Sequence, residues 1–313
     1  MKKLVLSFLL LFVLFGCQTE EPETAHLTIL MPNGSPALAQ VLFEAERPEI
    51  EGVTYEIERV FGPEPLLAAF GSESHNVIFA PTNVGARLIA SGAPYTLGAA
   101  INFGNNYIVA NRAFNTIDDL AGEHIIAFGQ QATPDIVLRS LLAASTIEEA
   151  NLPTIEYRGS VQEAMAALVA DNDAIVLLAE PVLSVAQMQV DDLHVLDLQA
   201  EWLRLKGEEG YPQAGIFIHN DVPRALAAAY LTQIEHAINV TLQNPQAAAE
   251  AAGALEYPFP YPVLLQAIPR SNLRFVSSED VRTSLETYFN VILEMNPNLI
   301  GGALPDDTFY FTE

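Results

Sequence analysis

Cysteine is almost absent from this chain: Cys17 is the single thiol among 313 residues. One cysteine cannot form a disulfide within the chain, and it cannot build the cysteine clusters that hold zinc or iron–sulfur groups. Because Cys17 directly follows an apolar N-terminal run, we expect its thiol to be acylated. An acylated mature chain would have no thiol for catalysis, redox chemistry or disulfides.

Basic residues are also scarce, since 14 lysines and arginines stand against 39 acids and give a formal net charge of −25. Two of the bases, Lys2 and Lys3, belong to the N-terminal signal described below, and Lys206 is the only other lysine. Because such an acidic surface repels nucleic acid and anionic lipid headgroups, neither is expected as a partner. The composition suits a salty or alkaline exterior, where charge is screened.

Catalytic signatures are missing from the sequence. It contains no GxSxG nucleophile elbow, no GxxxxGK[ST] phosphate loop, no HExxH motif and no GxGxxG after a predicted strand. The six histidines are scattered without the spacing of metal ligands. We therefore expect no catalytic residues, no metal and no cofactor.

Long apolar runs are limited to the N-terminus, where one extends from Leu4 to Phe15. This run is too short for a membrane-spanning helix and is typical of a secretory signal. We expect residues 1–16 to be a lipoprotein signal peptide and Cys17 to carry the lipid, with palmitate among its acyl chains. An uncleaved anchor or a free thiol is the alternative. Residues 17–25 are polar and acidic, and they predict a flexible tether.

The remaining chain is longer than one hydrophobic core usually serves, so we expect two lobes. Predicted strands and helices alternate along it, which favours an α/β fold with doubly wound, parallel sheets. The segment from Asp118 to Arg139 is a clear example. A strand from His124 to Phe128 ends at Gly129, and a helix opens beyond it with Thr133 as its cap and Pro134 at its first position.

Polar corners follow four of the predicted strands. In a parallel sheet the carboxyl ends of the strands share one edge, and helices that begin there present unpaired N–H groups. Such corners hold small polar solutes, although an ordinary strand-to-helix connection without a ligand is the alternative. The candidate ligand-binding residues in these corners are Asn33, Ser35, Thr82, Asn83, Gln130, Thr133, Asp135 and Glu180.

Further candidates flank the segments that we expect to join the lobes. Asn105 and Asn106, beside Tyr107, suit a flat polar ligand through hydrogen bonds and ring stacking, and a tight asparagine–glycine turn is the alternative. Tyr211 and Gln213 precede another predicted strand. For Glu180, at the end of a buried strand, the partner is a ligand amine or, alternatively, a structural ion pair.

Several motifs together resemble one protein family. They are the lipobox at Cys17 and the segments TIDDLAG at 116–122, APTNVG at 80–85, AEP at 179–181 and GGALPDD at 301–307. The chain is similar to the solute-binding lipoproteins of ABC importers in the nitrate, sulfonate, taurine and thiamine-precursor group. This resemblance implies a type II periplasmic-binding-protein-like fold, in which two lobes are joined by two crossings and clamp the ligand between them.

By the same resemblance, residues 26–110 and 211–313 form lobe 1 and residues 111–210 form lobe 2, with crossings near Asn111 and Gly210. The implied function is delivery of a small polar solute to an ABC permease by a monomer that is lipid-anchored outside the cytoplasm. An extracytoplasmic enzyme on the same fold is the alternative.

The charged residues in the corners indicate which class of solute to expect. Asp135 and Glu180 lie in the corners, whereas no arginine does. This favours a neutral or amine-bearing flat molecule, such as an aminopyrimidine precursor of thiamine. A sulfonate-, taurine- or nitrate-type anion is the next candidate, because helix N-termini favour anions.

Overall fold

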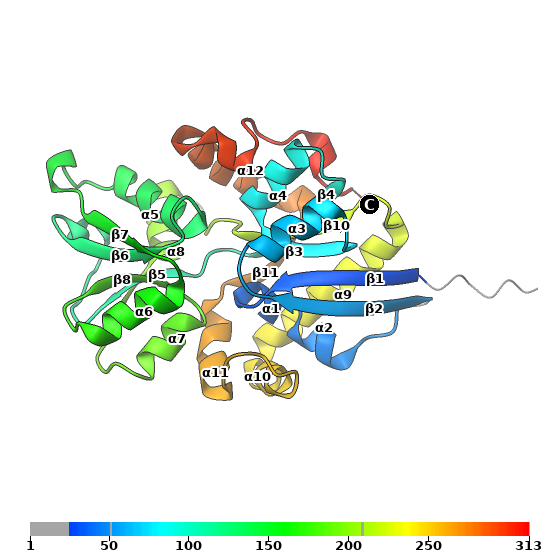
Figure 1. The fold of residues 1–313 in the computed structure, drawn as a ribbon, viewed down its shortest axis with the longest axis horizontal. Helices are drawn as coiled ribbons and strands as arrows, with labels where there is room; N and C mark the ends of the chain where they lie inside the picture. The colour runs from blue at the N-terminus through cyan, green and yellow to red at the C-terminus, as the bar shows by residue number, and fades with distance from the viewer. Residues whose placement is uncertain (1–24, 51, 208–209, 313) are drawn as a thin grey trace, which may run out of the picture.

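The computed structural model describes residues 25–50, 52–207 and 210–312, and they form two α/β lobes that lie side by side (Figure 1). Each lobe is built on one sheet, and the expected α/β fold class is confirmed. Within the described part of the chain, no helix is both long and apolar enough to cross a membrane. The predicted signal, lipidated Cys17 and most of the tether lie outside the described residues.

Lobe 1 contains a six-stranded sheet in the order β11-β4-β10-β3-β1-β2. Strands β1, β2 and β3 run parallel, whereas β10 is antiparallel to both β3 and β4, and β11 is antiparallel to β4. The expectation of a wholly parallel sheet is therefore wrong for this half of the sheet. The strands are β1 (Ala25–Pro32), β2 (Val53–Val60), β3 (Val77–Pro81), β4 (Tyr95–Asn102), β10 (Ala214–His219) and β11 (Leu273–Ser277).

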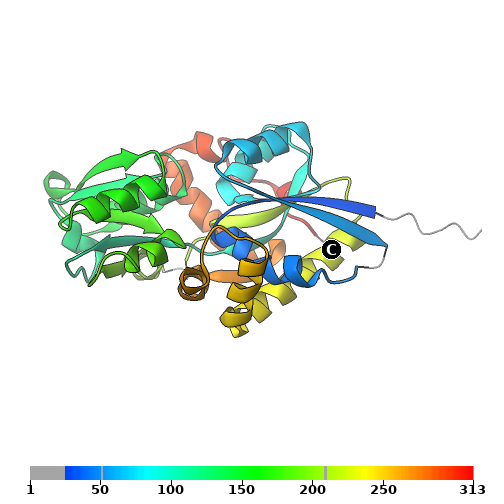
Figure 2. The same cartoon turned by 60° about the horizontal axis from the view of Figure 1, so that its bottom comes forward.

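Helices cover both faces of this sheet, as Figure 2 shows from a second side. Because side chains alternate along a strand, Leu30 and Ile78 face one helical layer, and Ile29 and Phe79 face the other. The first layer comprises α3 (Glu64–Ser72), α4 (Thr82–Ala90) and α12 (Ser278–Met295). The second comprises α1 (Ser35–Leu38), α2 (Val41–Glu46), α9 (Arg224–Gln243), α10 (Pro245–Ala254) and α11 (Tyr261–Arg270).

Lobe 2 contains a five-stranded sheet in the order β7-β6-β8-β5-β9. Strand β6 is parallel to β7 and β8, and β5 is antiparallel to β8 and β9. The strands are β5 (Asn106–Ala110), β6 (His124–Phe128), β7 (Thr154–Arg158), β8 (Ile175–Ala179) and β9 (His194–Asp197). The α-helices are α5 (Thr133–Ala144), α6 (Val161–Ala170), α7 (Val182–Gln187) and α8 (Leu198–Lys206). Short 3₁₀ turns are η1 (Ile117–Leu120) and η2 (Glu149–Asn151) here, and η3 (Pro297–Ile300) and η4 (Asp307–Phe309) in lobe 1.

The first crossing between the sheets lies earlier than the expected position near Asn111. Strand β5 is fully buried and pairs on both sides within the second sheet, so the chain leaves lobe 1 over residues 103–105. The chain returns between the end of α8 and the start of β10. We therefore propose a revised division, with residues 25–102 and 214–312 in lobe 1 and residues 106–206 in lobe 2.

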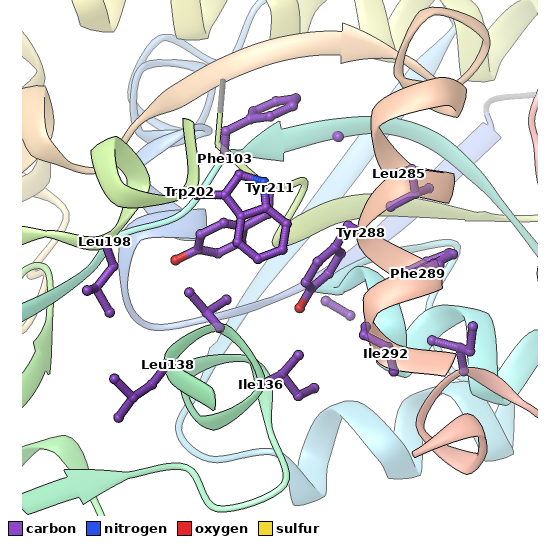
Figure 3. Packing of buried hydrophobic residues seen from close by; sticks show 14 of the residues in the cluster. Phe103, Ile136, Leu138, Leu198, Trp202, Tyr211, Leu285, Tyr288, Phe289 and Ile292 are labelled. Atoms are coloured by element: carbon purple, nitrogen blue, oxygen red, sulfur yellow. The ribbon is translucent and has the colours of Figure 1, made fainter. Parts of the chain in front are cut away.

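An apolar cluster joins the two lobes. The rings of Trp202 and Tyr211 lie 5.0 Å apart, and Tyr211 lies 5.7 Å from Tyr288 of α12, measured between ring centroids. Figure 3 shows these rings between α12 of lobe 1 and α5 of lobe 2, where Ile136 completes the contact. The lobes therefore share packed side chains in addition to the two crossings.

Close packing at Gly85 gives a test of the fold. A Cβ atom at Gly85 of α4 would lie 2.0 Å from the ring of Phe217, whereas a Cβ at Gly71 of α3 would meet nothing within 4 Å. Replacing a helical glycine with alanine normally stabilises a protein by about 0.5–1 kcal/mol. We expect Gly71→Ala to follow that rule and Gly85→Ala to destabilise by about 1–3 kcal/mol, as overpacking does. Urea unfolding of both variants measures the change in the free energy of unfolding. If Gly85→Ala were stabilised as much as Gly71→Ala, the close contact between Gly85 and Phe217 would be contradicted.

Candidate functional site

The carboxyl ends of the parallel strands in the two sheets face each other across the lobe boundary. Residues that follow β1 and β3 in lobe 1 meet residues that follow β6 and β8 in lobe 2. The Ser35 hydroxyl donates to the Glu180 carbonyl oxygen at 3.1 Å, and the Thr133 hydroxyl lies 3.5 Å from the amide oxygen of Asn83. We call the polar residues gathered here the interlobe junction.

Asn105, in the first crossing, is at the centre of the junction. Its amide nitrogen lies 2.9 Å from the Ser35 hydroxyl and 3.2 Å from the Glu180 carbonyl oxygen. Its amide oxygen accepts a hydrogen bond of 3.0 Å from the side chain of Gln213. This one buried side chain therefore links the corner after β1, the corner after β8 and the second crossing.

Asn106 extends the network on the other side of the crossing. Its side-chain nitrogen donates to the Tyr211 hydroxyl at 2.8 Å and to the Gln213 amide oxygen at 3.2 Å. The Tyr211 hydroxyl in turn donates to Gln199 at 2.8 Å, and the same Gln199 oxygen accepts the backbone N–H of Asn106 at 3.0 Å. All four side chains are neutral hydrogen-bonding groups, so this part of the junction suits an uncharged portion of a ligand.

Two helix N-termini form the second contact of the junction. Helix α4 begins at Thr82 and α5 at Thr133, and no side chain caps either one. Asn83 and Thr133 are both buried where the helices meet. Thr82 is fixed to the second crossing, because its hydroxyl donates to the Pro212 carbonyl at 2.6 Å and its N–H to the Gln213 carbonyl at 3.0 Å. The positive ends of two helix dipoles therefore converge from opposite lobes.

Glu180 has protein partners for its carboxylate. The Ser184 hydroxyl lies 2.9 Å and 3.0 Å from the two carboxylate oxygens, and the Ser184 N–H donates at 3.1 Å. Arg270 lies 3.5 Å from the same group, and the Glu180 side chain is 0% exposed. Burial raises the pKa of Glu180, and the contacts with Ser184 and Arg270 oppose that rise. This is the structural ion pair that the sequence left open as the alternative to a ligand amine.

Asp135 is engaged in a similar way, within lobe 2. One carboxylate oxygen accepts the Gln131 N–H at 2.7 Å, and the other accepts from Arg139 at 2.6 Å and from the Tyr157 hydroxyl. Burial and the neighbouring Asp135 raise the pKa of Tyr157 to about 12. Both carboxylates that the sequence suggested for an amine therefore already have partners, and Asp135 positions the corner before α5.

Three other predicted site residues lie at the margin of the junction. The Tyr107 hydroxyl donates to the Arg270 carbonyl at 2.6 Å, which ties β5 to α11. Asn33 is half-buried after β1, with its N–H bonded to the Val60 carbonyl at 2.8 Å. Gln130 is exposed in the turn before α5.

Sequence reasoning missed four residues that the structure brings to the junction: Gln199, Arg270, Ser271 and Tyr288. The Ser271 hydroxyl lies 3.0 Å from that of Ser35, and Arg270 contacts both Glu180 and Gln187. The signal available was the polar run that begins at Arg270, directly after an apolar helical stretch. Tyr288 lies on the buried, apolar face of α12, where helical spacing alone indicates a core residue.

Some buried polar atoms of the junction have no hydrogen-bond partner among the described residues. They include the amide oxygens of Asn102 and Asn106. The described part of the chain also contains no cluster of three or more His, Cys, Asp or Glu side chains that could hold a metal. Apart from the Arg270 guanidinium, which pairs with Glu180, the junction offers a ligand neutral amides and hydroxyls together with two helix N-termini.

The raised pKa of Glu180 predicts a pH-dependent stability. The folded protein holds this proton more tightly than the unfolded chain, so the stabilisation is complete below the ordinary pKa of 4.5 and is lost as the pH rises through the folded value. Glu180→Gln stays neutral throughout. Its stability relative to the wild type should therefore increase as the pH is raised from below 4.5 through neutral pH.

Thermal unfolding across this range measures the effect, and Glu250→Gln, at an exposed position, controls for loss of one negative charge. A relative stability of Glu180→Gln that falls with pH would show instead that Ser184 and Arg270 stabilise the ionised carboxylate more than burial penalises it.

Comparison with solved structures gives close fold matches at low sequence identity. An ABC transporter protein from Parabacteroides distasonis superposes with a TM-score of 0.82 at 18% identity, covering 93% of this chain and 99% of that chain. The periplasmic aliphatic sulphonate binding protein SsuA from Escherichia coli gives a TM-score of 0.66 at 16% identity, covering 93% and 95%. A ligand-binding component of an ABC-type import system from Staphylococcus aureus gives 0.70 at 11%, covering 92% and 96%.

These matches confirm the expected two-lobed, periplasmic-binding-protein-like fold. No protein with curated function matches the sequence. A model of one sequence family matches residues 95–292, which is well over half of the chain and includes both crossings. The protein therefore belongs to the family described as menaquinone biosynthesis, on a two-lobed periplasmic-binding-protein fold.

Proposed function

We propose that this protein is an extracytoplasmic solute-binding protein that delivers a small polar solute to an ABC permease. The observation that carries this proposal is the interlobe junction, where polar groups from both lobes meet at the carboxyl ends of the parallel strands. A solute held there contacts both lobes at once, so binding and the relative position of the lobes are coupled. The structural relatives named for ABC import support the same function.

The proposed binding residues follow from the sequence candidates and their positions in the structure. Asn105, Asn106, Tyr211 and Gln213 would orient the solute, and the starts of α4 and α5 would receive its polar end. Asn33, Gln130 and Tyr107 lie at the margin, and Asp135 and Glu180 support the site through protein contacts. Ser35, Thr82, Asn83 and Thr133 complete the set.

The contacts of the two carboxylates change the class of solute that we favour. An aminopyrimidine was favoured because Asp135 and Glu180 offered carboxylates, but both have protein partners. The remaining neutral donors and the helix N-termini favour a sulfonate- or nitrate-type solute. The E. coli relative named for aliphatic sulphonate binding supports this choice. An aminopyrimidine remains the second candidate.

One observation favours a different class of function. The matching family is described as menaquinone biosynthesis, which is a biosynthetic role. An enzyme on this fold that acts on a small polar solute is therefore the second candidate function. The predicted secretory signal at residues 1–16 supports the importer function, because delivery to a permease takes place outside the cytoplasm.

Solute binding should raise the melting temperature. A ligand at one hundred times its Kd adds about 2.7 kcal/mol to the stability of the folded state, which is several degrees for a chain of this size. Differential scanning fluorimetry with sulfonates, nitrate, carboxylates, amines and pyrimidines should find stabilisation by the anionic oxygen-bearing solutes. Stabilisation by pyrimidines alone would contradict an anionic solute and favour an aminopyrimidine.

The same samples separate binding from catalysis. Mass spectrometry after prolonged incubation should recover the stabilising solute unchanged. Stoichiometric recovery supports the binding protein, whereas turnover into a new compound would establish the enzyme in its place.

The proposed lipid anchor rests on Cys17 and the apolar run before it, which lie outside the described residues. We expect the full-length chain to fractionate with membranes and Cys17→Ala to be released into the soluble extracytoplasmic fraction, because the acyl chains are the only proposed attachment. Immunoblotting of cell fractions measures this. Membrane association that persists in Cys17→Ala would favour an uncleaved signal as the anchor.

A further inference from the structure

The C-terminal end of α11 makes a second contact between the lobes. Helix α11 of lobe 1 and α7 of lobe 2 lie side by side across the lobe boundary (Figure 1). The aromatic cluster of Trp202, Tyr211 and Tyr288 packs on the other face of each sheet. An opening of the lobes that pivots on that cluster therefore pulls α11 away from α7.

Arg270, the last residue of α11, is the centre of this contact. One guanidinium nitrogen donates to the Gln187 amide oxygen and lies 3.5 Å from a carboxylate oxygen of Glu180. The backbone carbonyl of Arg270 accepts a hydrogen bond of 2.6 Å from the Tyr107 hydroxyl. Lobe 2 therefore holds both the side chain and the main chain of this residue.

The hydrogen bond from Tyr107 also completes the end of α11. The last carbonyl groups of a helix have no partner within it, so they are satisfied from outside. For Arg270 the partner is Tyr107, which lies on β5 of lobe 2. The next carbonyl, that of Ser271, accepts from the side chain of Asn102 on β4 of lobe 1. Separation of the lobes would break the first of these hydrogen bonds and keep the second.

Lobe 2 presents its partners for Arg270 in fixed positions. The Glu180 carboxylate is held from its own lobe by the Ser184 hydroxyl, at 2.9 and 3.0 Å, and by the Ser184 N–H at 3.1 Å. Tyr107 belongs to a fully buried strand that is paired on both sides. Gln187 is the last residue of α7. The contact can therefore break and form again without rearrangement of lobe 2.

We propose that Arg270 is a latch that holds the two lobes closed in the absence of a solute. The latch consists of its contacts with Gln187, Glu180 and Tyr107, all of which cross the lobe boundary. Because the protein alone makes these contacts, they favour the closed arrangement whether or not a solute occupies the junction. The latch sets how often the lobes open, and so how fast a solute enters and leaves.

Arg204 offers a matched control for the experiment. Its side chain is 39% exposed, as is that of Arg270, and it pairs at 2.6 Å with Glu201, whose side chain is 6% exposed. Its other partner is Asp118, at 3.2 Å. Arg204, Glu201 and Asp118 all lie in lobe 2, so Arg204→Gln removes a comparable ion pair without affecting the lobe boundary.

The test measures the separation of the lobes directly. Because Cys17 is the single cysteine, the soluble Cys17→Ala chain accepts spin labels only at introduced cysteines. Ala166 of α6 and Gln266 of α11 are exposed and lie in different lobes, so Ala166→Cys and Gln266→Cys provide the labelling sites. Double electron–electron resonance then gives the distribution of distances between the labels. The protein is refolded from denaturant beforehand to remove carried-over solute, and no solute is added.

We expect the shorter distance, that of the closed lobes, to dominate in the labelled reference protein. Arg270→Gln should shift the ratio of closed to open molecules about tenfold or more toward the open form, the scale of hydrogen bonds to a charged group. Tyr107→Phe should shift the ratio in the same direction by a smaller factor. Arg204→Gln should change it less than about twofold.

Three outcomes would overturn the latch. They are a reference protein that is mostly open without solute, a distribution that Arg270→Gln and Tyr107→Phe leave unchanged, and an equal shift in Arg204→Gln. Circular dichroism checks that each variant is folded, and Tyr107→Phe decides the question if Arg270→Gln does not fold. Because no solute is present, failure of the latch leaves the proposed function untouched, and failure of solute binding leaves the latch untouched.

Discussion

The burial of neutral amide side chains between the lobes is the constraint on which the rest of the structure depends. Asn105 lies in the first crossing and Asn106 is the first residue of β5, and each is 5% exposed or less. A buried amide that loses its partner costs about 1–3 kcal/mol, so Ser35, Gln213 and Tyr211 must stay where they meet these side chains. The same requirement holds the corners of the two sheets at hydrogen-bonding distance. The hydrogen bonds that these buried amides require therefore also bring together the polar groups that could bind a ligand.

Apolar packing limits how the lobes can move about that junction. Trp202, Tyr211 and Tyr288 lie within 6.0 Å of one another and connect α8, the second crossing and α12. Pulling these rings apart would expose apolar surface at about 25 cal/mol per Å². Any opening of the lobes must therefore pivot close to this cluster and separate the corners after β1, β3, β6 and β8 instead. Such a pivot gives a solute access to the very groups that would bind it.

Local signals in the sequence predicted many of the elements. Strand β6, bounded by Gly122 and Gly129, forms where it was expected. The capping pair of Thr116 and Asp119 and the cap of Ser160 on Glu163 are also visible in the local sequence, because each depends on neighbours a few residues away. Elements that depend on distant partners were harder to predict. Helix α11 contains Pro269 and so lacks a regular helical signal, and the antiparallel direction of β5 and β10 follows from the crossings.

In the site, too, features set by adjacent residues could be predicted, whereas contacts between residues far apart in the sequence could not. The corners were predictable, since strand ends and helix starts can be read from adjacent residues. The partners of the carboxylates were not, because Glu180 meets Arg270 from the other lobe and Asp135 meets Tyr157 from the next strand. Those non-local contacts changed the expected solute from an amine to an oxyanion.

Hydrogen–deuterium exchange with and without a stabilising solute tests the central claim most directly, that one small polar solute binds both lobes at the interlobe junction. The account predicts slower exchange in the starts of α4 and α5 and at Asn105 and Asn106, where the first crossing enters β5, with all three segments protected at the same solute concentration. Protection confined to one lobe, or placed away from these segments, would contradict it.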